Sequence, residues 1–345
     1  MSENLRRGRR LDRRLSVAPM MDWTDRHCRF FLRGFSPDVL LYTEMITAAA
    51  IVRGDRARLL RFEPEEHPLA LQLGGSEPRE LAAAARAGEE AGYDEINLNC
   101  GCPSERVASG AFGACLMHEP LRVAECVSEM SAAVRVPVTV KMRIGVVSAS
   151  AREARGAAAQ YTEGDFEALC DFVRGVRAAG CQVAIVHARQ AVLGGLSPKD
   201  NREVPPLRYD VVRRLKGVFA SLPIVVNGGL RDADSVRAVL SWCDGVMLGR
   251  EAYHRPFVLA ELHRSLAAEP RATPSRAALI ERMARYCERE LAAGERLAAI
   301  TRHMLGLYSG EPGARDFRRT LSEGARAAGA GAELLRRAIP TAARD

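Results

Sequence analysis

The sequence predicts an α/β protein, a (β/α)8 barrel followed by a C-terminal helical domain. Three observations favour this fold class: eight short apolar runs recur along the chain, helical spacing separates most of them, and the strand pattern stops near residue 255. We therefore expect a basic, disordered tail over 1–14, a barrel over 15–255 and a helical domain over 256–345. The length of 345 residues suits a barrel with one appended domain.

Each run predicts a buried strand, because it is apolar or β-branched over about four to six residues. The runs are Leu15–Met20, Val39–Met45, Leu69–Leu73, Glu95–Cys100, Val138–Ile144, Val183–Arg189, Pro223–Gly229 and Gly245–Arg250. Segments rich in Ala, Glu and Arg lie between them and predict helices. Examples are Pro78–Gly92, Glu119–Val134, Asp165–Gly180, Arg208–Ser221 and Asp232–Trp242. The stretch 146–162 shows no clear strand pattern and predicts a long loop or a short extra helix.

A doubly wound sheet is the alternative α/β fold. Such a sheet usually has fewer strands and carries its glycine-rich turn after the first strand. Here the first strand ends in Pro19, Met20 and Met21 without a G-x-G-x-x-G motif, and the glycine-rich turns follow the seventh and eighth strands. This order favours the barrel.

Beyond about residue 256 the sequence predicts helices only. They are expected at Ser275–Ala293, Glu295–Tyr308, Ala314–Gly329 and Ala332–Ile339, with glycines and prolines between them. This domain would serve either as a structural cap on the barrel or, given its arginine content, as an RNA-binding surface.

The net charge of +7 is concentrated at the two ends of the chain. The tail 1–14 has six arginines and two acidic residues, and 256–345 has fifteen arginines and eleven acidic residues, so the middle is nearly neutral. This distribution indicates a polyanionic partner. Among 50 basic residues only Lys141, Lys199 and Lys216 are lysines, so a retained lysine is a candidate for a role that arginine cannot fill.

The nine cysteines are scattered, and their odd number favours reduced thiols and a cytoplasmic location over a disulfide framework. We expect no metal, because Cys100 and Cys102 are too close together for the usual zinc spacing and no second pair follows. We expect no membrane span, because no apolar run approaches about 20 residues. Nor do we expect a secretory signal, because no apolar segment follows Met1–Arg14.

The turns after the last two predicted strands indicate a phosphate site. Gly228 and Gly229 follow Asn227 after the seventh strand, and Gly249 follows the eighth. Glycine turns that precede helices expose backbone N–H groups to an anion, and Arg250 would add a charge-assisted contact. The alternative is that these glycines only permit tight turns.

Two residues with titratable side chains, Lys141 and His187, lie within predicted strands. Lys141 must point into the barrel mouth and find an anionic partner. The candidates are the electron-rich edge of a flavin ring, a carbonyl substrate held as a Schiff base in an aldolase, or a buried salt bridge. His187 would contact a ring or a phosphate, or would be an ordinary core histidine.

Cys102 lies in a glycine-flanked loop just beyond the fourth strand. A cysteine thiol is ordinarily protonated at neutral pH, so it can act as a general acid as well as a nucleophile. The residues alone do not choose between Cys100 and Cys102. Either one could instead be a small buried apolar residue, which is the commoner fate of cysteine.

Together these motifs resemble the tRNA-dihydrouridine synthases over about residues 15–335. The segments that carry the resemblance are Ser16–Arg26, Leu41–Met45, Ala70–Gly75, Asp94–Ser104, His187–Arg189, Asn227–Gly229 and Val246–Tyr253. Further segments resemble the A-type subfamily, which acts on U20 and U20a of the D-loop. These are Met20–Thr24, Leu196–Glu203 with Pro205–Leu207, and Arg302–Leu307 with Pro312–Arg315.

The resemblance implies FMN in the barrel mouth, with NADPH or NADH as the reductant. By motif position, the FMN contacts would be Pro19, Met20, Met21, Gln72, Lys141, His187, Asn227, Gly228, Gly229, Gly249 and Arg250. The target uridine would leave the base stack, accept a hydride at C6 from the flavin, and be protonated at C5 by Cys102.

The resemblance also implies a tRNA partner bound across the barrel and the helical domain, and we expect a monomer. Asn99 would hold the uracil or nearby tRNA. Lys199, Arg202, Arg315 and Arg318 would orient the tRNA, with an affinity that falls as salt rises.

Two other functions stay open at this point. An FMN barrel dehydrogenase acting on a free pyrimidine would explain the barrel but not the arginine-rich helical domain. A non-catalytic tRNA-binding protein would bind tRNA without oxidising NADPH.

Overall fold

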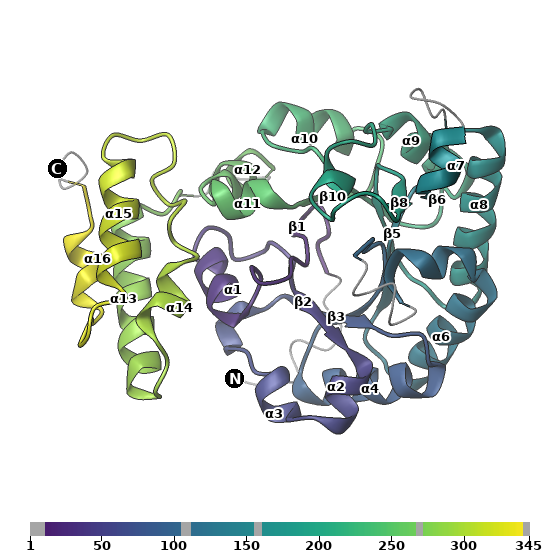
Figure 1. Ribbon diagram of the computed structural model, residues 1–345. Coiled ribbons are helices and arrows are strands. Elements are labelled where there is room, and N and C mark those ends of the chain that lie inside the picture. Colours follow the sequence, from purple (N-terminus) through teal and green to yellow (C-terminus); the bar gives the residue numbers. More distant parts are fainter. Residues whose placement is uncertain (1–10, 105–111, 155–160, 267–271, 341–345) are drawn as a thin grey trace.

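The computed structural model describes residues 11–104, 112–154, 161–266 and 272–340. Eight parallel strands form a barrel in the order β1-β10-β9-β7-β5-β4-β3-β2 (Figure 1). The backbone of β1 also pairs with Leu40, just before β2, which nearly closes the ring. The predicted (β/α)8 barrel is therefore confirmed. The strands are β1 (Leu15–Val17), β2 (Leu41–Thr47), β3 (Leu69–Gly74), β4 (Glu95–Cys100), β5 (Val138–Arg143), β7 (Ala184–His187), β9 (Ile224–Asn227) and β10 (Gly245–Leu248).

The alternation of side chains along the strands creates two cores. Ile185 and Val225 point inward and belong to a small cluster inside the barrel. Their neighbours Val186 and Val226 point outward and join the large core between the strands and the surrounding helices. Because both faces are buried, the strands appear in the sequence as continuous apolar runs.

The long helices around the barrel begin and end at residues suited to those positions. In α4, Pro78 occupies the first turn and Gly92 ends the helix with φ +103°. In α8, Thr162 and Asp165 form a capping box. The helices that accompany the barrel strands are α1 (Arg26–Arg33), α2 (Ala48–Arg53), α3 (Arg56–Leu59), α4 (Pro78–Ala91), α6 (Pro120–Ala133), α8 (Glu163–Ala178), α9 (Tyr209–Val218), α10 (Ala233–Leu240), α11 (Arg250–His254) and α12 (Val258–Leu266).

The remaining helices form a separate group beside the barrel, at the left of Figure 1. They are α13 (Arg276–Ala292), α14 (Leu297–Thr301), α15 (Ala314–Gly324) and α16 (Glu333–Arg337). α13 packs against α16, and α14 contacts α1 of the barrel. α12 instead contacts α10 and α11. The domain boundary at residue 255 stays a prediction.

The helix expected at Glu295–Tyr308 is wrong in its extent. Only Leu297–Thr301 is α-helical, and the chain then continues in turns whose N–H groups bond three residues back. The cause is a close approach to the barrel. A Cβ on Gly306 would lie 2.4 Å from the backbone oxygen of His254, so this segment follows the surface that it touches.

The short extra helix expected within 146–162 is present as α7 (Ala149–Ala154), but the strand before it was not expected: β6 (Val146–Ser148) pairs with β8 (Ala191–Leu193) in a second small sheet. Strands of three residues are too short to leave a periodic pattern. Residues 155–160 lie outside the described part of the chain. Disorder was expected over 1–14, but residues 11–14 are ordered, and Arg13 forms an ion pair with Glu95; residues 1–10 lie outside the described part of the chain.

Among the helices in the described ranges, none has an apolar stretch long enough to span a bilayer.

Candidate active site

The expected site residues lie at the carboxyl ends of neighbouring strands, around one mouth of the barrel. In the strand register, Asn99 of β4 stands beside Lys141 of β5. Arg143 of β5 stands beside His187 of β7, which in turn stands beside Asn227 of β9. The parallel strands therefore bring residues from distant segments into two adjacent rows at the same end of the barrel, joined through Lys141 and Arg143 of β5.

Hydrogen bonds hold the loop that follows β4. Asn99 Oδ1 accepts from the backbone nitrogens of Gly101 at 3.0 Å and Cys102 at 3.1 Å. Asn99 Nδ2 donates to Gln72 Oε1 at 2.9 Å. The bond to Asn99 holds the backbone of Cys102, and the residue is half-buried.

The two cysteines of this loop have different surroundings. Cys100 is 0% exposed and packs in the core outside the barrel, where burial raises the pKa of its thiol well above the usual range. Both cysteines are free thiols. Burial leaves Cys100 inert, and Cys102 is the thiol available to a ligand in the mouth.

Lys141 has no hydrogen bond or ion pair with any part of the chain that the structure describes. Burial, together with the nearby charge of Arg143, lowers the pKa of its ammonium to about 8. No ion pair among the described residues therefore supports the salt-bridge interpretation of Lys141. An ammonium that is desolvated and has no such partner is suited to bind an electron-rich or anionic ligand.

His187 is neutral and surrounded by cations. Burial lowers the pKa of its imidazole well below the usual range, and Arg143, Lys141, Arg189 and Arg202 lower it further. The ring therefore offers one donor and one acceptor rather than a charge. The same cations give this side of the mouth a positive potential.

Arg143 and Arg202 lie next to His187, and Arg250 lies next to Arg202; we call these three residues the arginine group. Burial lowers the pKa of Arg143 to about 10, and burial with the charge of Arg250 lowers the pKa of Arg202. The buried Nε of Arg202 has no hydrogen-bond partner. The acidic group at this cluster is Glu203, whose carboxylate forms a 2.6 Å ion pair with Arg250. Mutual repulsion among these cations favours an anionic ligand.

Two of the three glycines expected at the phosphate site, Gly228 and Gly229, are required by the backbone. Gly228 and Gly229 have φ of +112° and +73°, and a Cβ on Gly228 would lie 2.6 Å from the His187 ring. At Gly249 a Cβ would meet no atom within 4 Å, so open space lies above that turn. A glycine that permits a tight turn can also present its backbone N–H to an anion, so both interpretations of these glycines can hold together.

The loop after β1 joins the mouth to the helical group. Pro19 and Met20 are partly buried at the end of β1, and Met21 is 55% exposed. Trp23 stacks on Tyr253 with ring centroids 4.4 Å apart. Next to it, Asp25 Oδ2 accepts from Arg302 at 2.6 Å and lies 2.9 Å from His303 Nε2. This joint brings together the segments Met20–Thr24 and Arg302–Leu307 that marked the A-type resemblance.

The four residues expected to orient tRNA lie in two separate places. Lys199 and Arg202 follow β8 on the barrel, whereas Arg315 and Arg318 lie on α15 in the helical group. Lys199, Arg315 and Arg318 are exposed. None of the four forms an ion pair with an acidic side chain among the residues described, although the charge of Glu203 acts on Lys199 and Arg202.

The sequence reasoning missed Arg143 as a site residue. Its Nε donates to the Gly101 carbonyl at 3.1 Å, and its Nη1 donates to the Asn201 carbonyl at 3.0 Å. Arg143 thus ties the Cys102 loop to the loop that carries Lys199. The signal was present, because Arg143 lies two residues after Lys141 on the same strand and faces the same side.

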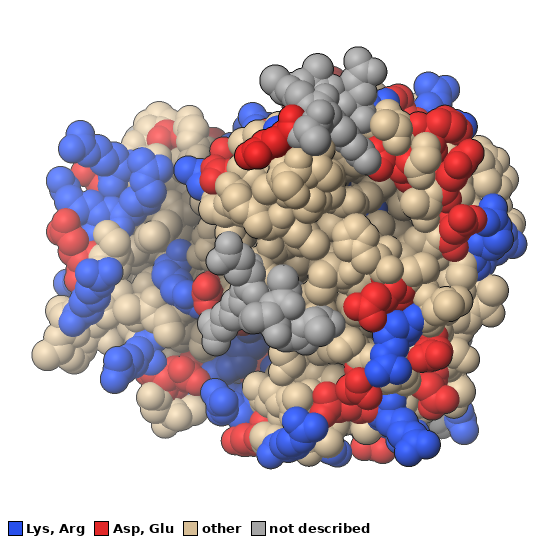
Figure 2. All heavy atoms as spheres, turned by 45° about the vertical axis from the view of Figure 1, so that its right-hand side comes forward, with Lys and Arg blue, Asp and Glu red and all other residues tan. Residues whose placement is uncertain are grey.

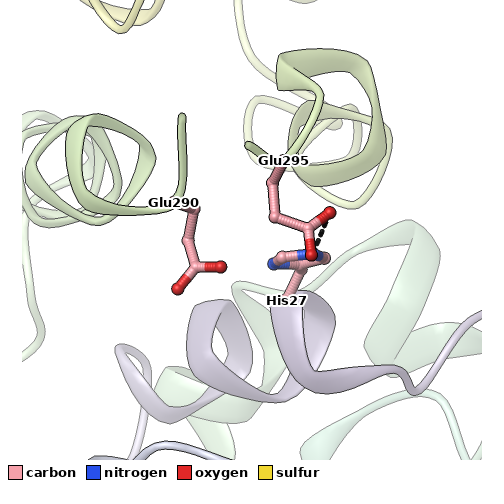
Figure 3. A group of neighbouring side chains, drawn as sticks. All are labelled: His27, Glu290 and Glu295. Carbon is pink, nitrogen blue, oxygen red and sulfur yellow. Dashed lines mark ion pairs between the residues drawn. The ribbon is translucent and has the colours of Figure 1, made fainter. Parts of the chain in front are cut away.

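A cluster of His27, Glu290 and Glu295 lies away from the mouth, where α1 meets the helical group (Figure 3). Its carboxylates already have a cation, because Arg26 contacts Glu290 at 2.5 Å and Glu295 at 2.6 Å. Burial and the charge of Arg26 lower the pKa of His27 to about 4. The ion pairs of Arg26 with these carboxylates join the two parts of the chain.

Comparison with known proteins gives consistent matches over nearly the whole chain. The family model described as dihydrouridine synthase (Dus) matches residues 16–344. The chain is similar to proteins named tRNA-dihydrouridine(20/20a) synthase from three bacteria. It is 54% identical to that of Xanthomonas axonopodis pv. citri, with 94% of this chain and 93% of the relative covered. It is 55% identical to that of Pseudomonas aeruginosa, with 90% of this chain and 90% of the relative covered. It is 53% identical to that of Synechocystis, with 94% of this chain and 93% of the relative covered.

Proposed function

The chain belongs to the dihydrouridine synthase family, and from this premise we propose that it reduces the C5=C6 bond of uridine at positions 20 and 20a of tRNA. The names of the relatives at about 50% identity support these positions. The single observation that carries the proposal for the site is the meeting of Cys102, Lys141 and the arginine group around one barrel mouth.

We propose FMN as the cofactor, because the residues in the mouth fit its two ends. The unpaired ammonium of Lys141 and the neutral ring of His187 suit an electron-rich ring edge. The glycine turns and Arg250 suit a phosphate. Gln72, Asn227 and the loop Pro19–Met21 would line the remaining sides. Bound FMN would supply the hydride chemistry, and NADPH or NADH would supply the electrons.

Cys102 would hold the proton that the uracil C5 receives. Its loop supports this role, because Asn99 holds the backbone and the residue is only half-buried. Arg143 fixes the same loop from the other side through the Gly101 carbonyl. A general acid held in this way contributes typically about 100-fold or more to a rate.

We propose that tRNA contacts both the barrel mouth and α15. Figure 2 shows Lys and Arg side chains gathered over the helical group at the left of the view. Arg315 and Arg318 are exposed there, and Lys199 and Arg202 stand near the mouth. A phosphate backbone that reaches both places would position the extruded uridine over the site, and the affinity should fall steeply with salt. We further propose that the protein acts as a monomer in the cytoplasm.

The test is to purify the protein, record its visible spectrum, and incubate it with NADPH and an unmodified tRNA transcript. The proposal expects a flavin spectrum that bleaches with NADPH and recovers as dihydrouridine forms in the tRNA. A flavin that reoxidises with a free pyrimidine but not with tRNA would favour the free-pyrimidine dehydrogenase. Tight tRNA binding without flavin would favour the non-catalytic protein.

A further inference from the structure

The hydrogen bonds that fix the Cys102 loop continue through the barrel interior to its opposite end. Gln72 Nε2 donates to Asn97 Oδ1 at 2.7 Å, and Asn97 Nδ2 donates to the Thr139 hydroxyl at 2.8 Å. That hydroxyl donates to Glu95 Oε1 at 2.6 Å. Asn97, Thr139 and Glu95 are each 0% exposed, so no bulk water can replace these bonds.

The two ends of this chain of bonds fix its direction independently. At the upper end, the backbone nitrogens of Gly101 and Cys102 can only donate, so Asn99 must turn its oxygen toward them. At the lower end, Glu95 is the acceptor, because its carboxylate receives the hydroxyl of Thr139 on one oxygen and the guanidinium of Arg13, at 2.6 Å, on the other. Every amide between them has its donor toward Glu95 and its acceptor toward Cys102.

A reversed amide at Asn99, Gln72 or Asn97 would place two donors or two acceptors opposite each other in the buried interior of the barrel. Such a mismatch is costly, since a buried polar group without a partner loses its solvation without compensation. The orientation of Asn99 is therefore coupled to a carboxylate at the far end of the barrel, through three buried side chains, Gln72, Asn97 and Thr139.

We propose that Glu95 and Thr139 are positioning residues for the Cys102 loop. The carboxylate of Glu95 sets the direction of the hydrogen bonds, and Thr139 passes that direction to Asn97. This role rests on the proposed function only where Cys102 is taken as the proton donor. The positioning of the loop itself is a property of the protein without substrate.

The protein offers a matched control variant for this proposal at Tyr42. Tyr42 donates to the same Glu95 oxygen at 2.6 Å, and its hydroxyl also lies close to that of Thr139, but it forms no hydrogen bond with Asn97 among the described residues. Tyr42→Phe and Thr139→Val each remove one buried hydroxyl from Glu95. Only Thr139→Val breaks the series of hydrogen bonds between Glu95 and the Cys102 loop. Thr139→Ser keeps the hydroxyl and should therefore keep that series intact.

The experiment measures hydrogen exchange of the Gly101 and Cys102 amides by mass spectrometry, and alkylation of Cys102 by iodoacetamide, in the full-length protein and these three variants. In Thr139→Val we expect exchange at the two amides to be about tenfold faster, the ratio that corresponds to one net hydrogen bond, and Cys102 to be alkylated faster. Tyr42→Phe and Thr139→Ser should stay within about twofold of the wild type.

With substrate, Thr139→Val should lower kcat for dihydrouridine formation and leave KM for tRNA unchanged. If Thr139→Val does not accumulate as folded protein, Asn97→Ala breaks the path one bond higher and leaves Thr139 bonded to Glu95. Equal exchange and alkylation in Thr139→Val and Tyr42→Phe would overturn the proposal, whether both change or neither does. A wild type that makes no dihydrouridine would refute the proposed function and leave the exchange result to decide the positioning role.

Discussion

The side-chain oxygen of Asn99 lies 3.1 Å from the backbone nitrogen of Cys102 and accepts its hydrogen bond. The other end of the same amide donates to Gln72. Asn99 therefore joins the loop of the proposed acid to a residue expected to contact the cofactor. A uracil contact by Asn99, which the resemblance implies, has to share an amide that is already engaged at both ends.

Asn99→Ala tests this link. The change leaves the Gln72 oxygen and the N–H groups of Gly101 and Cys102 without their partner, so we expect the free energy of unfolding to fall by about 1 to 3 kcal/mol. We also expect kcat to fall at least about tenfold, because the acid is no longer held in place. Urea unfolding and single-turnover assays measure the two effects. A kcat within twofold of the wild type would contradict the link.

Lys141→Met tests whether the lysine is kept for a ligand. Its pKa is lowered from the usual value to about 8, so in the ligand-free protein its charge opposes folding at neutral pH. The unfolded chain binds more protons between about pH 8 and 10, and wild-type stability should therefore rise with pH in that range. The variant should be more stable at pH 7 by up to about 3 kcal/mol and lack this rise.

The control for this prediction is Lys141→Arg, which keeps a charge at every accessible pH. We expect Lys141→Arg to show no pH-dependent rise in stability and to retain more flavin affinity than Lys141→Met. Unfolding curves between pH 6 and 10, with flavin titrations, separate these results. A ligand-free Lys141→Met protein that is less stable than the wild type would show that Lys141 has a stabilising partner.

Glu203→Gln tests whether the ion pair with Arg250 competes with a phosphate. Both side chains are partly exposed, so the pair is weak and an incoming anion can replace it. Without the carboxylate, affinity for FMN should rise by about twofold to fivefold, and the gain should shrink as salt increases. Glu163→Gln, which removes a similar surface pair with Arg214, should leave the affinity unchanged. Equal or weaker binding by Glu203→Gln would argue against a phosphate at Arg250.

Asp25→Asn tests the joint between the barrel and the helical group. Burial alone would raise the pKa of Asp25, but the hydrogen bonds and charges of His303 and Arg302 lower it below its usual range. A carboxyl with a lowered pKa stabilises the fold above the unfolded value near 4, and this contribution is lost as the pH falls. The variant should therefore lose about 1 to 3 kcal/mol at pH 7 and progressively less below about pH 4.

Urea unfolding at several pH values measures this effect. Asp171→Asn, which breaks the exposed pair with Arg174 within α8, is the control and should change stability by less than about 1 kcal/mol. A pH-independent loss in Asp25→Asn would mean that the carboxylate charge does not hold the joint.

The barrel could be predicted from the sequence because its strands are buried on both faces. Runs such as Val183–Arg189 stay apolar whichever side the residues face, and helices with clear spacing separate them. β6 and β8 could not be predicted, because three-residue strands have no period to detect. The helix expected over Glu295–Tyr308 was predicted too long, because only the folded barrel shows how closely Gly306 approaches His254.

The site could be predicted only as far as strand ends identify it. Lys141, His187 and Asn227 follow from their places in the strands; the register pairs His187 with Asn227 and with Arg143, two residues after Lys141. The choice between Cys100 and Cys102 could not be made from the sequence, since it depends on Cys100 facing the outer core at the end of β4 and on the path of the loop that follows, which leaves Cys102 only half-buried. Arg143 donates to the carbonyl of Asn201, which lies 58 residues away in the sequence, and no local sequence pattern indicates that contact.

The most direct test of the central claim is to map dihydrouridine in an unmodified tRNA transcript after incubation with NADPH and either the wild-type protein or Cys102→Ala. Transcripts with cytidine at position 20, at 20a or at both serve as position controls. The account predicts dihydrouridine at 20 and 20a with the wild type, none in the doubly substituted transcript, and a rate at least about 100-fold lower for Cys102→Ala with its flavin retained. Dihydrouridine at other positions, or an unchanged rate for Cys102→Ala, would contradict it.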